Sequence, residues 1–277
     1  MQLVPKTTIA LLGCSNGWQR TEANQIRYQR LVALLKQEYG LEVIEYETVW
    51  QDSLTQTTYS AQQRAKYLRE ALENPAVTAI FDLTGGELAN QVLAVLPIAK
   101  LASQRRSGIY YVAYSDNSVL LNALLALPYC LPVNFWLPGI ESDWLTRQFF
   151  TQAFVEGELG SYSEQTIGGN LRCFLKLAGT PYFPTITAAQ TLVLEASSGS
   201  LDRICSLLMQ AKQIGLLDQV ERIVLGQFNE IDQKGQRKQL KNYLADLTPV
   251  PIEECRQLGH QLPLRPIAYR KLKAKRY

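Results

Sequence analysis

The sequence predicts an α/β fold: an N-terminal domain with a parallel sheet and a nucleophile elbow, followed by a smaller C-terminal α/β domain. The first half alternates apolar strand patterns with amphipathic helix patterns, which is typical of a parallel sheet with helices on its faces. The periodicity weakens over 137–165, where Gly157 and Gly160 interrupt the chain. We therefore expect the N-terminal domain over 1–145, a connection over 146–166 and the C-terminal domain over 167–277.

The elements of the first half follow from the period of their apolar residues. Apolar runs bounded by turn residues predict buried strands, and apolar residues three and four apart predict helices. The expected strands cover 8–13, 41–46, 77–83 and 109–113, and the expected helices cover 23–38, 60–74 and 87–96. In the second half we expect short strands, a strand ending near residue 195 among them, and one clear helix over 201–214. Since ligands bind at the carboxyl ends of such strands, Gly13, Gly85-Gly86 and Ser115 could face one crevice.

Composition excludes several classes of function. The 277 residues are 47% hydrophobic and carry a formal charge of +3, so the whole-chain field does not point to nucleic acid. The basic C-terminal residues are expected to form a solvated tail: Arg265, Arg270, Lys271, Lys273, Lys275 and Arg276. No apolar run is long enough to cross a membrane and no secretory signal pattern opens the chain, so we expect a cytoplasmic protein.

Cysteine spacing and glycine motifs give no sign of a metal or a cofactor. The five cysteines are odd in number and form no C-x-x-C pair, which predicts reduced thiols rather than a zinc site or a thioredoxin-like centre. Neither a G-x-x-x-x-G-K-[ST] loop nor a G-x-G-x-x-G turn is present. We expect no metal and no cofactor.

The chain has a single histidine, His260. Hydrolytic chemistry at neutral pH usually needs an imidazole as proton shuttle, so an enzyme of that kind would have to use this residue. On residue type alone, a packed or surface histidine is the commoner interpretation.

Ser115 is the best partner for His260. It follows the apolar run 109–113 and precedes a helical pattern that begins at Val119, which is the arrangement of a nucleophile elbow. Such a turn lifts the hydroxyl above the sheet and offers free helix N–H groups to a developing oxyanion. Ala113 and Asn117 occupy the usual elbow glycine positions. From this segment alone, an ordinary capped turn is an equally good interpretation.

Five segments in order resemble one family. Ala113-Tyr114-Ser115-Asp116 resembles the Gly-Tyr-Ser-Asp nucleophile motif of the LD-carboxypeptidase family, serine peptidases with a Ser-Glu-His triad that include the microcin C immunity peptidases. The segment 81–87 resembles the family's Gly-Gly turn, and 167–171 with 178–182 resembles its Gly-Gly-Asn-Leu and Gly-Thr-Pro-Tyr signature. The region that holds the family's glutamate is resembled by 192–195 with 201–203 and 223–228, and the segment that holds its histidine by 259–264. The resemblance runs from about residue 9 to residue 272.

The resemblance assigns roles to particular residues. It implies Ser115 as nucleophile, His260 as general base and Glu195 as the acid that orients the imidazole. Glu195 could instead be a first-turn acid of the next helix, and Asp202 is a competing acid that the pattern places inside that helix. The implied oxyanion donors are the amides of the Gly85-Gly86 turn, which could also be a plain tight turn, and of Asp116.

Four further residues lie where they could line the pocket: Ser15, Asn16, Trp18 and Thr84. Turn chemistry and a partly buried aromatic ring explain the first three equally well. Thr84 stands where the carboxypeptidase branch has arginine, and Asn90-Gln91 looks more like the immunity branch. The chain also departs from the family in having only Gln261 between His260 and the Leu-Pro pair, and Ala196 after the glutamate.

The resemblance implies hydrolysis of an amide bond next to a free carboxylate. Release of the terminal D-alanine of a murein tetrapeptide, a step of peptidoglycan recycling, is the expected reaction. Cleavage of an aminoacyl-nucleotide is the alternative within the family, and an inactive binding protein on the same scaffold is the alternative of another class. A small peptide or aminoacyl-nucleotide is the expected partner, with no nucleic acid or membrane, and the resemblance implies a homodimer.

Overall fold

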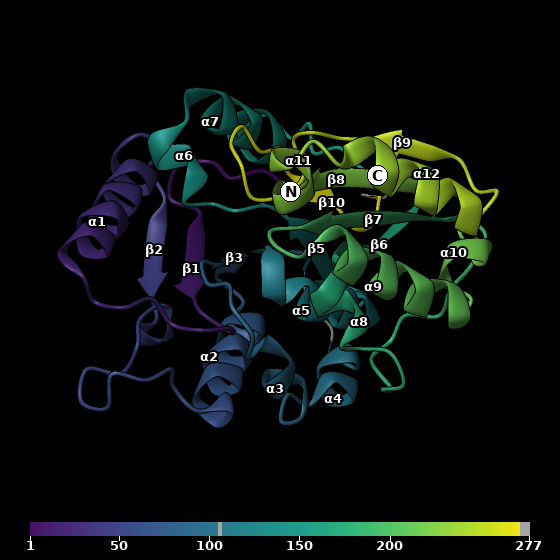
Figure 1. The fold of residues 1–277 in the computed structure, drawn as a ribbon. Helices are drawn as coiled ribbons and strands as arrows, with labels where there is room; N and C mark the ends of the chain where they lie inside the picture. The colour runs from purple at the N-terminus through teal and green to yellow at the C-terminus, as the bar shows by residue number, and fades with distance from the viewer. Residues whose placement is uncertain (105–106, 272–277) are drawn as a thin grey trace.

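Two sheets built mainly of parallel strands organise the chain, and the computed structural model describes residues 1–104 and 107–271 of it (Figure 1). The first sheet has the strand order β10-β5-β4-β3-β1-β2. Its parallel strands are β1 (Thr8–Leu12), β2 (Glu42–Glu45), β3 (Val77–Asp82), β4 (Ile109–Ala113) and β5 (Cys130–Asn134), and β10 (Ile267–Ala268) pairs with β5 antiparallel. The second sheet, β6 (Gln165–Asn170), β7 (Gln190–Ala196), β8 (Arg222–Phe228) and β9 (Ile252–Glu254), is parallel throughout. This confirms the predicted fold class.

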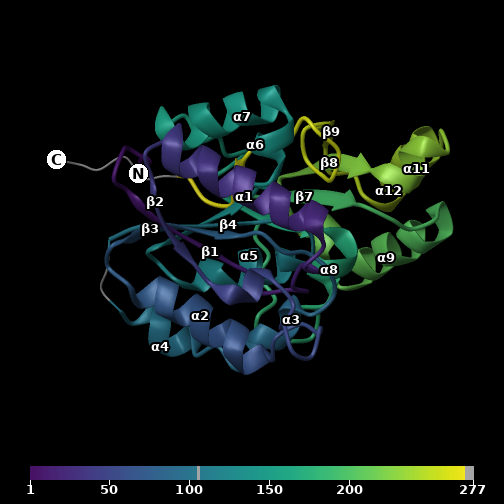
Figure 2. The same cartoon turned by 90° about the vertical axis from the view of Figure 1, so that its left-hand side faces the viewer.

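Helices cover both faces of the first sheet (Figure 2). Alternate residues of β1 enter two different cores: Ile9 and Leu11 join one, Ala10 and Leu12 the other. On one face lie α1 (Glu22–Gln37), α6 (Gly139–Ser142), α7 (Trp144–Phe150) and the π-helical turn η4 (Thr151–Val155). The other face carries α2 (Ala61–Glu73), α3 (Ala89–Leu93), α4 (Ile98–Ala102) and α5 (Ser118–Ala123). Single 3-10 turns complete this part: η1 (Glu47–Val49), η2 (Ser115–Asn117) and η3 (Leu124–Ala126).

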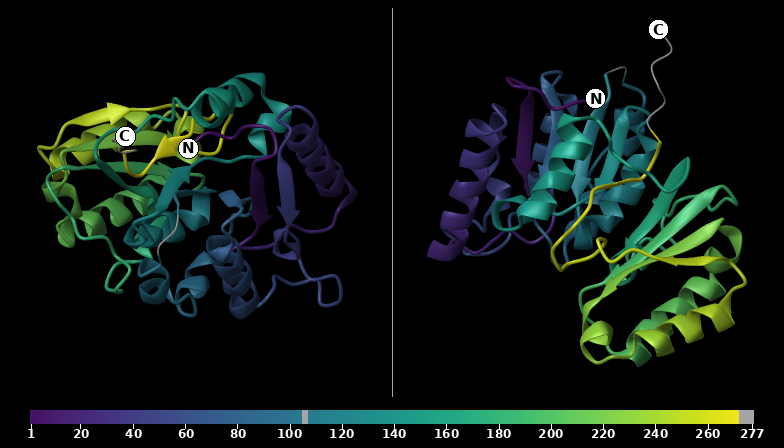
Figure 3. Two further views of the ribbon diagram at one scale, coloured as in Figure 1. Left: turned by 180° about the vertical axis from the view of Figure 1, so that it is seen from behind. Right: turned by 90° about the horizontal axis from the view of Figure 1, so that it is seen from above.

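The second sheet has its own helices and shares a core with the first. They are α8 (Leu171–Leu175), α9 (Leu201–Gln213), α10 (Leu216–Gln219), α11 (Asn229–Gln233) and α12 (Arg237–Leu247), and Figure 3 shows α9 and α12 on the side of the sheet away from the first one. Buried residues of β7 belong to the same apolar cluster as α5. Asn122 of α5 closes the junction, because its side chain donates to the carbonyl of Gly168 and accepts from the amide of that residue.

The strongly periodic elements lie where the sequence predicts them, within one or two residues, and the helix expected over 87–96 is shorter. Helix α3 begins at Ala89, whose amide donates to the Asp116 carboxylate, and it ends at Leu93, before Pro97. The weakly periodic stretch is helical over much of its length, since α6, α7 and η4 pack Phe150 and Phe154 into the core. Irregular chain covers 156–164 of it, apart from a turn at 137–138 and the break at Asp143 between α6 and α7. The domain boundaries stay a prediction, although β10, from the range assigned to the C-terminal domain, pairs with the first sheet.

The end of the described chain is partly docked rather than solvated. Arg270 is half-buried and its guanidinium donates to the backbone carbonyls of Leu125, Leu127 and Pro128, so the expectation of a wholly solvated tail is wrong for this residue. Lys273, Lys275 and Arg276 lie outside the described residues. All five cysteines lie within the described residues, and none of them forms a disulfide. No helix within 1–104 and 107–271 combines the length and the apolar character needed to cross a membrane.

Candidate active site

Ser115 occupies a strained turn between β4 and α5. Its φ is +55°, in the left-handed region that a residue with a Cβ rarely adopts. Ser118 connects the turn to the second sheet, because its Oγ donates to the Ser115 carbonyl and accepts from the amide of Asn170. A non-glycine residue held in this conformation at the end of a parallel strand is the geometry of a nucleophile elbow.

Glu195 and His260 come together although they are 65 positions apart in sequence. Glu195 Oε2 lies 2.8 Å from His260 Nδ1, with the glutamate side chain 2% exposed and the histidine side chain 16% exposed. At this distance the two groups form an ion pair whenever the imidazole is protonated. Glu195 lies near the end of β7, and Asp202 lies in the first turn of α9 as the pattern predicts.

The environment of His260 favours its protonated form. Burial, the largest influence, lowers the pKa of the imidazole, but the charge and close contact of Glu195 outweigh it and raise the pKa above its ordinary value. The second nitrogen, Nε2, is buried and has no hydrogen-bond partner in the described part of the chain. The ring centre lies 5.8 Å from that of Tyr114, the residue before Ser115. An imidazole oriented on one side and unpartnered on the other is suited to take up a proton.

The Gly85-Gly86 turn lies against the elbow. A Cβ built on Gly85 would lie 3.5 Å from the Cβ of Ser115, so the two backbones approach closely. Gly86 has φ +139°, and a Cβ there would lie 2.3 Å from Asn16 Oδ1. Gly86 is therefore required by its backbone conformation and packing, and the turn lies beside Ser115 as an oxyanion donor must. The roles of these glycines and of the Asp116 amide stay predictions.

The four pocket residues differ in how much of them a substrate could reach. Ser15 and Thr84 are fully buried: Ser15 Oγ donates to Asp116 Oδ2 at 2.6 Å, and Thr84 Oγ1 donates to Asp82 and accepts from the Ser15 amide. Asn16 is half-buried, and its Oδ1 accepts from the amide of Glu87. Trp18 is half-buried too and packs edge-on against another tryptophan ring at 6.0 Å. Ser15 and Thr84 thus support the turn from inside, and substrate contact by the four residues stays a prediction.

Gln227 holds the loop that carries the histidine. Its Oε1 accepts from the amides of His260 and Gln261 at 2.8 and 2.6 Å, and its Nε2 donates to the carbonyls of Arg256 and Gln261. One side chain therefore holds the chain on both sides of the His260 amide, from Arg256 to Gln261. Nothing in the sequence points to this role, because a glutamine at the end of an apolar strand does not show which loop it will contact.

We expect Gln227→Met to lower kcat by about 10- to 100-fold, because small misplacements of a catalytic group cost rates of that order. The loop loses four hydrogen bonds, so the imidazole loses its fixed position. Steady-state kinetics on the purified variant measure the effect. Gln213→Met, at an exposed position at the end of α9, is the matched control. Unchanged kcat in Gln227→Met would show that the loop keeps its position without this residue.

Arg27 and Trp136 extend the site beyond the residues chosen from the sequence. The Arg27 guanidinium lies over the Trp136 ring, 4.7 Å from its centre, and this ring lies 5.8 Å from that of Tyr114. The guanidinium makes no ion pair or hydrogen bond within the residues that the structure describes. Helical periodicity shows that Arg27 is not on the buried face of α1, but only the tertiary structure places it near the elbow.

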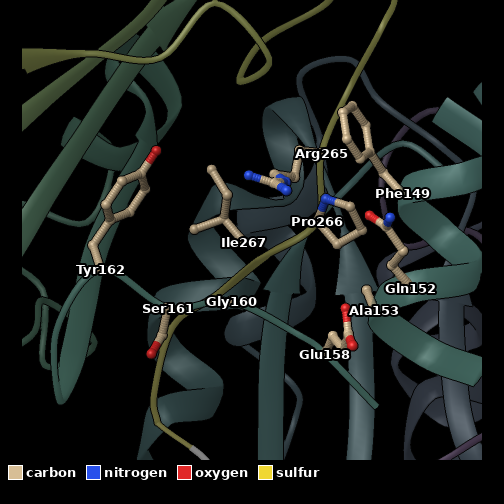
Figure 4. A pocket seen from close by; sticks show the side chains of 10 residues that line it. All are labelled: Phe149, Gln152, Ala153, Glu158, Gly160, Ser161, Tyr162, Arg265, Pro266 and Ile267. Carbon is tan, nitrogen blue, oxygen red and sulfur yellow. The ribbon is translucent and has the colours of Figure 1, made fainter. Parts of the chain in front are cut away.

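A separate cavity lies elsewhere on the molecule (Figure 4). It has a volume of about 280 Å³ and lies between η4 and the chain around Arg265. Figure 4 shows Phe149 and Gln152 on one side of it and Tyr162 on the other. None of Ser115, Glu195 and His260 lines this cavity. It is therefore not the place where the predicted chemistry would occur.

Comparison with known proteins identifies relatives over most of the chain. Residues 9–129 match the model of the LD-carboxypeptidase N-terminal domain, and residues 164–272 match that of the LD-carboxypeptidase C-terminal domain. A carboxypeptidase homologue of Vibrio cholerae is 23% identical over 258 residues, covering 76% of this chain and 74% of that protein. The microcin C7 self-immunity protein of Escherichia coli is 20% identical over 252 residues, covering 73% of this chain and 72% of that protein.

Two solved structures show the same fold. The muramoyltetrapeptide carboxypeptidase of Oxalobacter formigenes has a TM-score of 0.76 at 23% identity, covering 95% of this chain and 92% of that one. The microcin C7 self-immunity protein in complex with aspartyl sulfamoyl adenosine has a TM-score of 0.79 at 18% identity, covering 96% of this chain and 92% of that one. At these identities the similarity shows the fold alone. The same fold occurs in the muramoyltetrapeptide carboxypeptidase and in the microcin C7 self-immunity protein.

Proposed function

This chain belongs to the LD-carboxypeptidase family of serine peptidases, and from that premise we propose that it cleaves an amide bond next to a free carboxylate, releasing the terminal D-alanine of a murein tetrapeptide. The observation that carries the proposal is the pairing of Glu195 with His260 beside the strained elbow at Ser115. In the proposed reaction His260 removes the proton of Ser115, and the hydroxyl oxygen attacks the carbonyl.

The later steps use the same groups. The backbone amides of the glycine turn and of Asp116 donate hydrogen bonds to the negatively charged oxygen of the tetrahedral intermediate. His260 then gives its proton to the leaving amine, and Glu195 stabilises the imidazolium in the meantime. Water attacks the acyl-enzyme with the same residues in reverse roles. The unpartnered Nε2 of His260 supports this sequence, since catalytic hydrogen bonds are often formed only once a substrate is bound.

Arg27 supports recognition of an anionic group on the substrate. Thr84 stands where the carboxypeptidase branch has arginine, and its side chain is buried and bonded to Asp82. The guanidinium of Arg27, held on Trp136 and free of any carboxylate partner in the described chain, supplies a cation near the elbow from another element. Guanidinium groups pair with carboxylates through two parallel hydrogen bonds.

We expect Arg27→Met to raise KM by about 10- to 100-fold with little change in kcat, because a hydrogen bond to a charged group contributes about 1.5–3 kcal/mol. The effect should be confined to substrates with a free carboxylate and absent for the corresponding C-terminal amide. Arg30→Met is the matched control, since Arg30 is one turn further along α1, has a 70% exposed side chain and pairs with Glu141 at 3.5 Å. Equal loss for acid and amide substrates would contradict carboxylate recognition by Arg27.

The alternative within the family is cleavage of an aminoacyl-nucleotide. The sequence argument for it rests on Thr84 together with Asn90-Gln91, and its second part loses weight because Gln91 Oε1 accepts from the Arg64 guanidinium and so has a packing role. Further support is that the E. coli relative is a microcin C7 self-immunity protein. Cytoplasmic location, a part in peptidoglycan recycling and homodimer formation remain predictions, and size-exclusion chromatography tests the last of these.

Incubation with two substrates side by side tests the proposal. The purified protein and its Ser115→Ala variant are mixed with murein tetrapeptide and with aspartyl sulfamoyl adenosine. Release of D-alanine by the wild type alone supports the proposed reaction, whereas release of the nucleotide amine alone favours the alternative. Inertness toward both, with Ser115 unlabelled by a serine-directed fluorophosphonate, would indicate a binding protein.

A further inference from the structure

Lys176 belongs to the C-terminal half of the chain, and its side chain reaches the elbow at Ser115 and Asp116. It lies just after α8, and its Nζ donates to Asp116 Oδ1 at 2.6 Å and to the backbone carbonyl of Glu87 at 2.9 Å. The side chain is 19% exposed. Asp116 directly follows Ser115, and Glu87 directly follows the Gly85-Gly86 turn. One ammonium group therefore joins the two backbone segments from which the oxyanion donors are expected.

The carboxylate that receives Lys176 is fully buried and shared among several segments. Asp116 has a side-chain exposure of 0%. Its Oδ2 accepts from Ser15 Oγ at 2.6 Å and from the amide of Ala89 at 2.8 Å, while Oδ1 faces Lys176. Burial acts to raise the pKa of this carboxyl, but the hydrogen bonds and the charge of Lys176 outweigh it and lower the pKa below its ordinary value. The group is therefore a buried anion whose one direct ion-pair partner in the described chain is Lys176.

A second cation, Arg172 of α8, contacts Glu87 next to the glycine turn but does not contact Asp116. Arg172 pairs with the Glu87 carboxylate, which is 57% exposed. A surface pair of this kind contributes little to stability or position. Lys176 differs from it in reaching the backbone carbonyl and the buried carboxylate together.

We propose that Lys176 is a positioning residue for the oxyanion hole: by bridging Asp116 and the Glu87 carbonyl, it sets the distance between the elbow amide and the glycine turn. The inference rests on the proposed function, since it concerns the geometry of that reaction. It also assigns this task to a side chain from the C-terminal half, although the expected oxyanion donors lie beside the first sheet.

The expected result for Lys176→Met is a fall in kcat of about 10- to 100-fold with KM changed less than about twofold, because transition-state donors act on kcat and the loss of one costs about 10²–10³. Labelling of Ser115 by a fluorophosphonate should slow in parallel, since the phosphoryl oxygen needs the same donors. Arg172→Met, the matched control four positions earlier in α8, should keep both rates. Lys176→Arg, which keeps the cation, should recover part of the loss.

A double variant separates positioning from stability. Lys176→Met leaves a buried carboxylate without its cation, which by itself destabilises the fold. Asp116→Asn combined with Lys176→Met removes the unpaired charge, so the melting temperature should return toward that of the wild type while kcat stays low. Recovery of kcat together with the melting temperature, or wild-type kcat in Lys176→Met, would overturn the inference.

Labelling of the wild type keeps the two proposals apart. A wild-type protein that is labelled at Ser115, with Lys176→Met labelled at the same rate, contradicts the positioning role and leaves the proposed function standing. A wild-type protein that is not labelled at all overturns the proposed function and this inference with it.

Discussion

Replacing His260 with alanine is expected to lower kcat by about 10⁴-fold or more, because loss of one triad member removes the proton transfer on which the others depend. The chain has no other imidazole to take over the role. In the structure Nδ1 lies 2.8 Å from Glu195, and Nε2 is buried without a partner. A ring with a buried carboxylate on one side and an unpartnered nitrogen on the other supports the predicted role in proton transfer.

The fold should survive this substitution. The loop is held by the backbone contacts of His260 and Gln261 with Gln227, and alanine keeps all of them. Circular dichroism of His260→Ala should therefore resemble that of the wild type, while its melting temperature should be lower, because the buried Glu195 carboxylate loses its partner. Gln261→Ala is the matched control, since that side chain is exposed and its contacts with Gln227 are made by its backbone. Turnover near the wild-type rate in His260→Ala would remove the triad interpretation.

The sequence predicts this fold well where apolar periodicity is strong. The run 109–113 forms β4, and the long helix pattern after Thr21 forms α1, with the Thr21 side chain accepting from the amide of Asn24 at its start. The bounds of short elements cannot be predicted from apolar periodicity, because tertiary contacts determine where these elements begin and end. Helix α3 begins where Asp116, 27 positions away in sequence, accepts from the Ala89 amide. Strand β10 is two residues long and exists only through its pairing with β5.

The contrast between local sequence patterns and tertiary contacts also applies to the residues of the candidate site. Ser115, Glu195 and His260 are chosen because ordered motifs around them resemble those of the family, and their catalytic roles remain predictions. Lys176 and Asp116 are 60 positions apart, and nothing local to either residue shows that they meet. Ser15 and Thr84 look like pocket residues because they follow strand ends, but their small side chains bond inward to Asp116 and Asp82. A strand end locates the crevice without telling which side chains face it.

Replacing Glu195 with glutamine is expected to lower the maximal kcat by about 10³- to 10⁴-fold, the scale of losing the acid of a Ser-His-Asp triad. Glutamine fills the same space next to Nδ1 but cannot stabilise the imidazolium by charge. The carboxylate is 2% exposed, so solvent screens its effect on His260 little. The loss should therefore appear in kcat and kcat/KM alike.

The pH dependence of the Glu195→Gln variant distinguishes this role from mere packing. His260 must be neutral to accept the proton of Ser115, so kcat/KM of the wild type falls as pH drops through the raised pKa of His260, above its ordinary value of about 6.5. In the variant the two raising influences of Glu195 are gone and burial alone remains, which lowers the pKa. The acid limb of the profile should therefore move to lower pH even as the maximum falls. Asp202→Asn, an exposed acid in the next helix, should leave both unchanged, and an acid limb that stays in place in Glu195→Gln would show that another group sets the ionisation of the base.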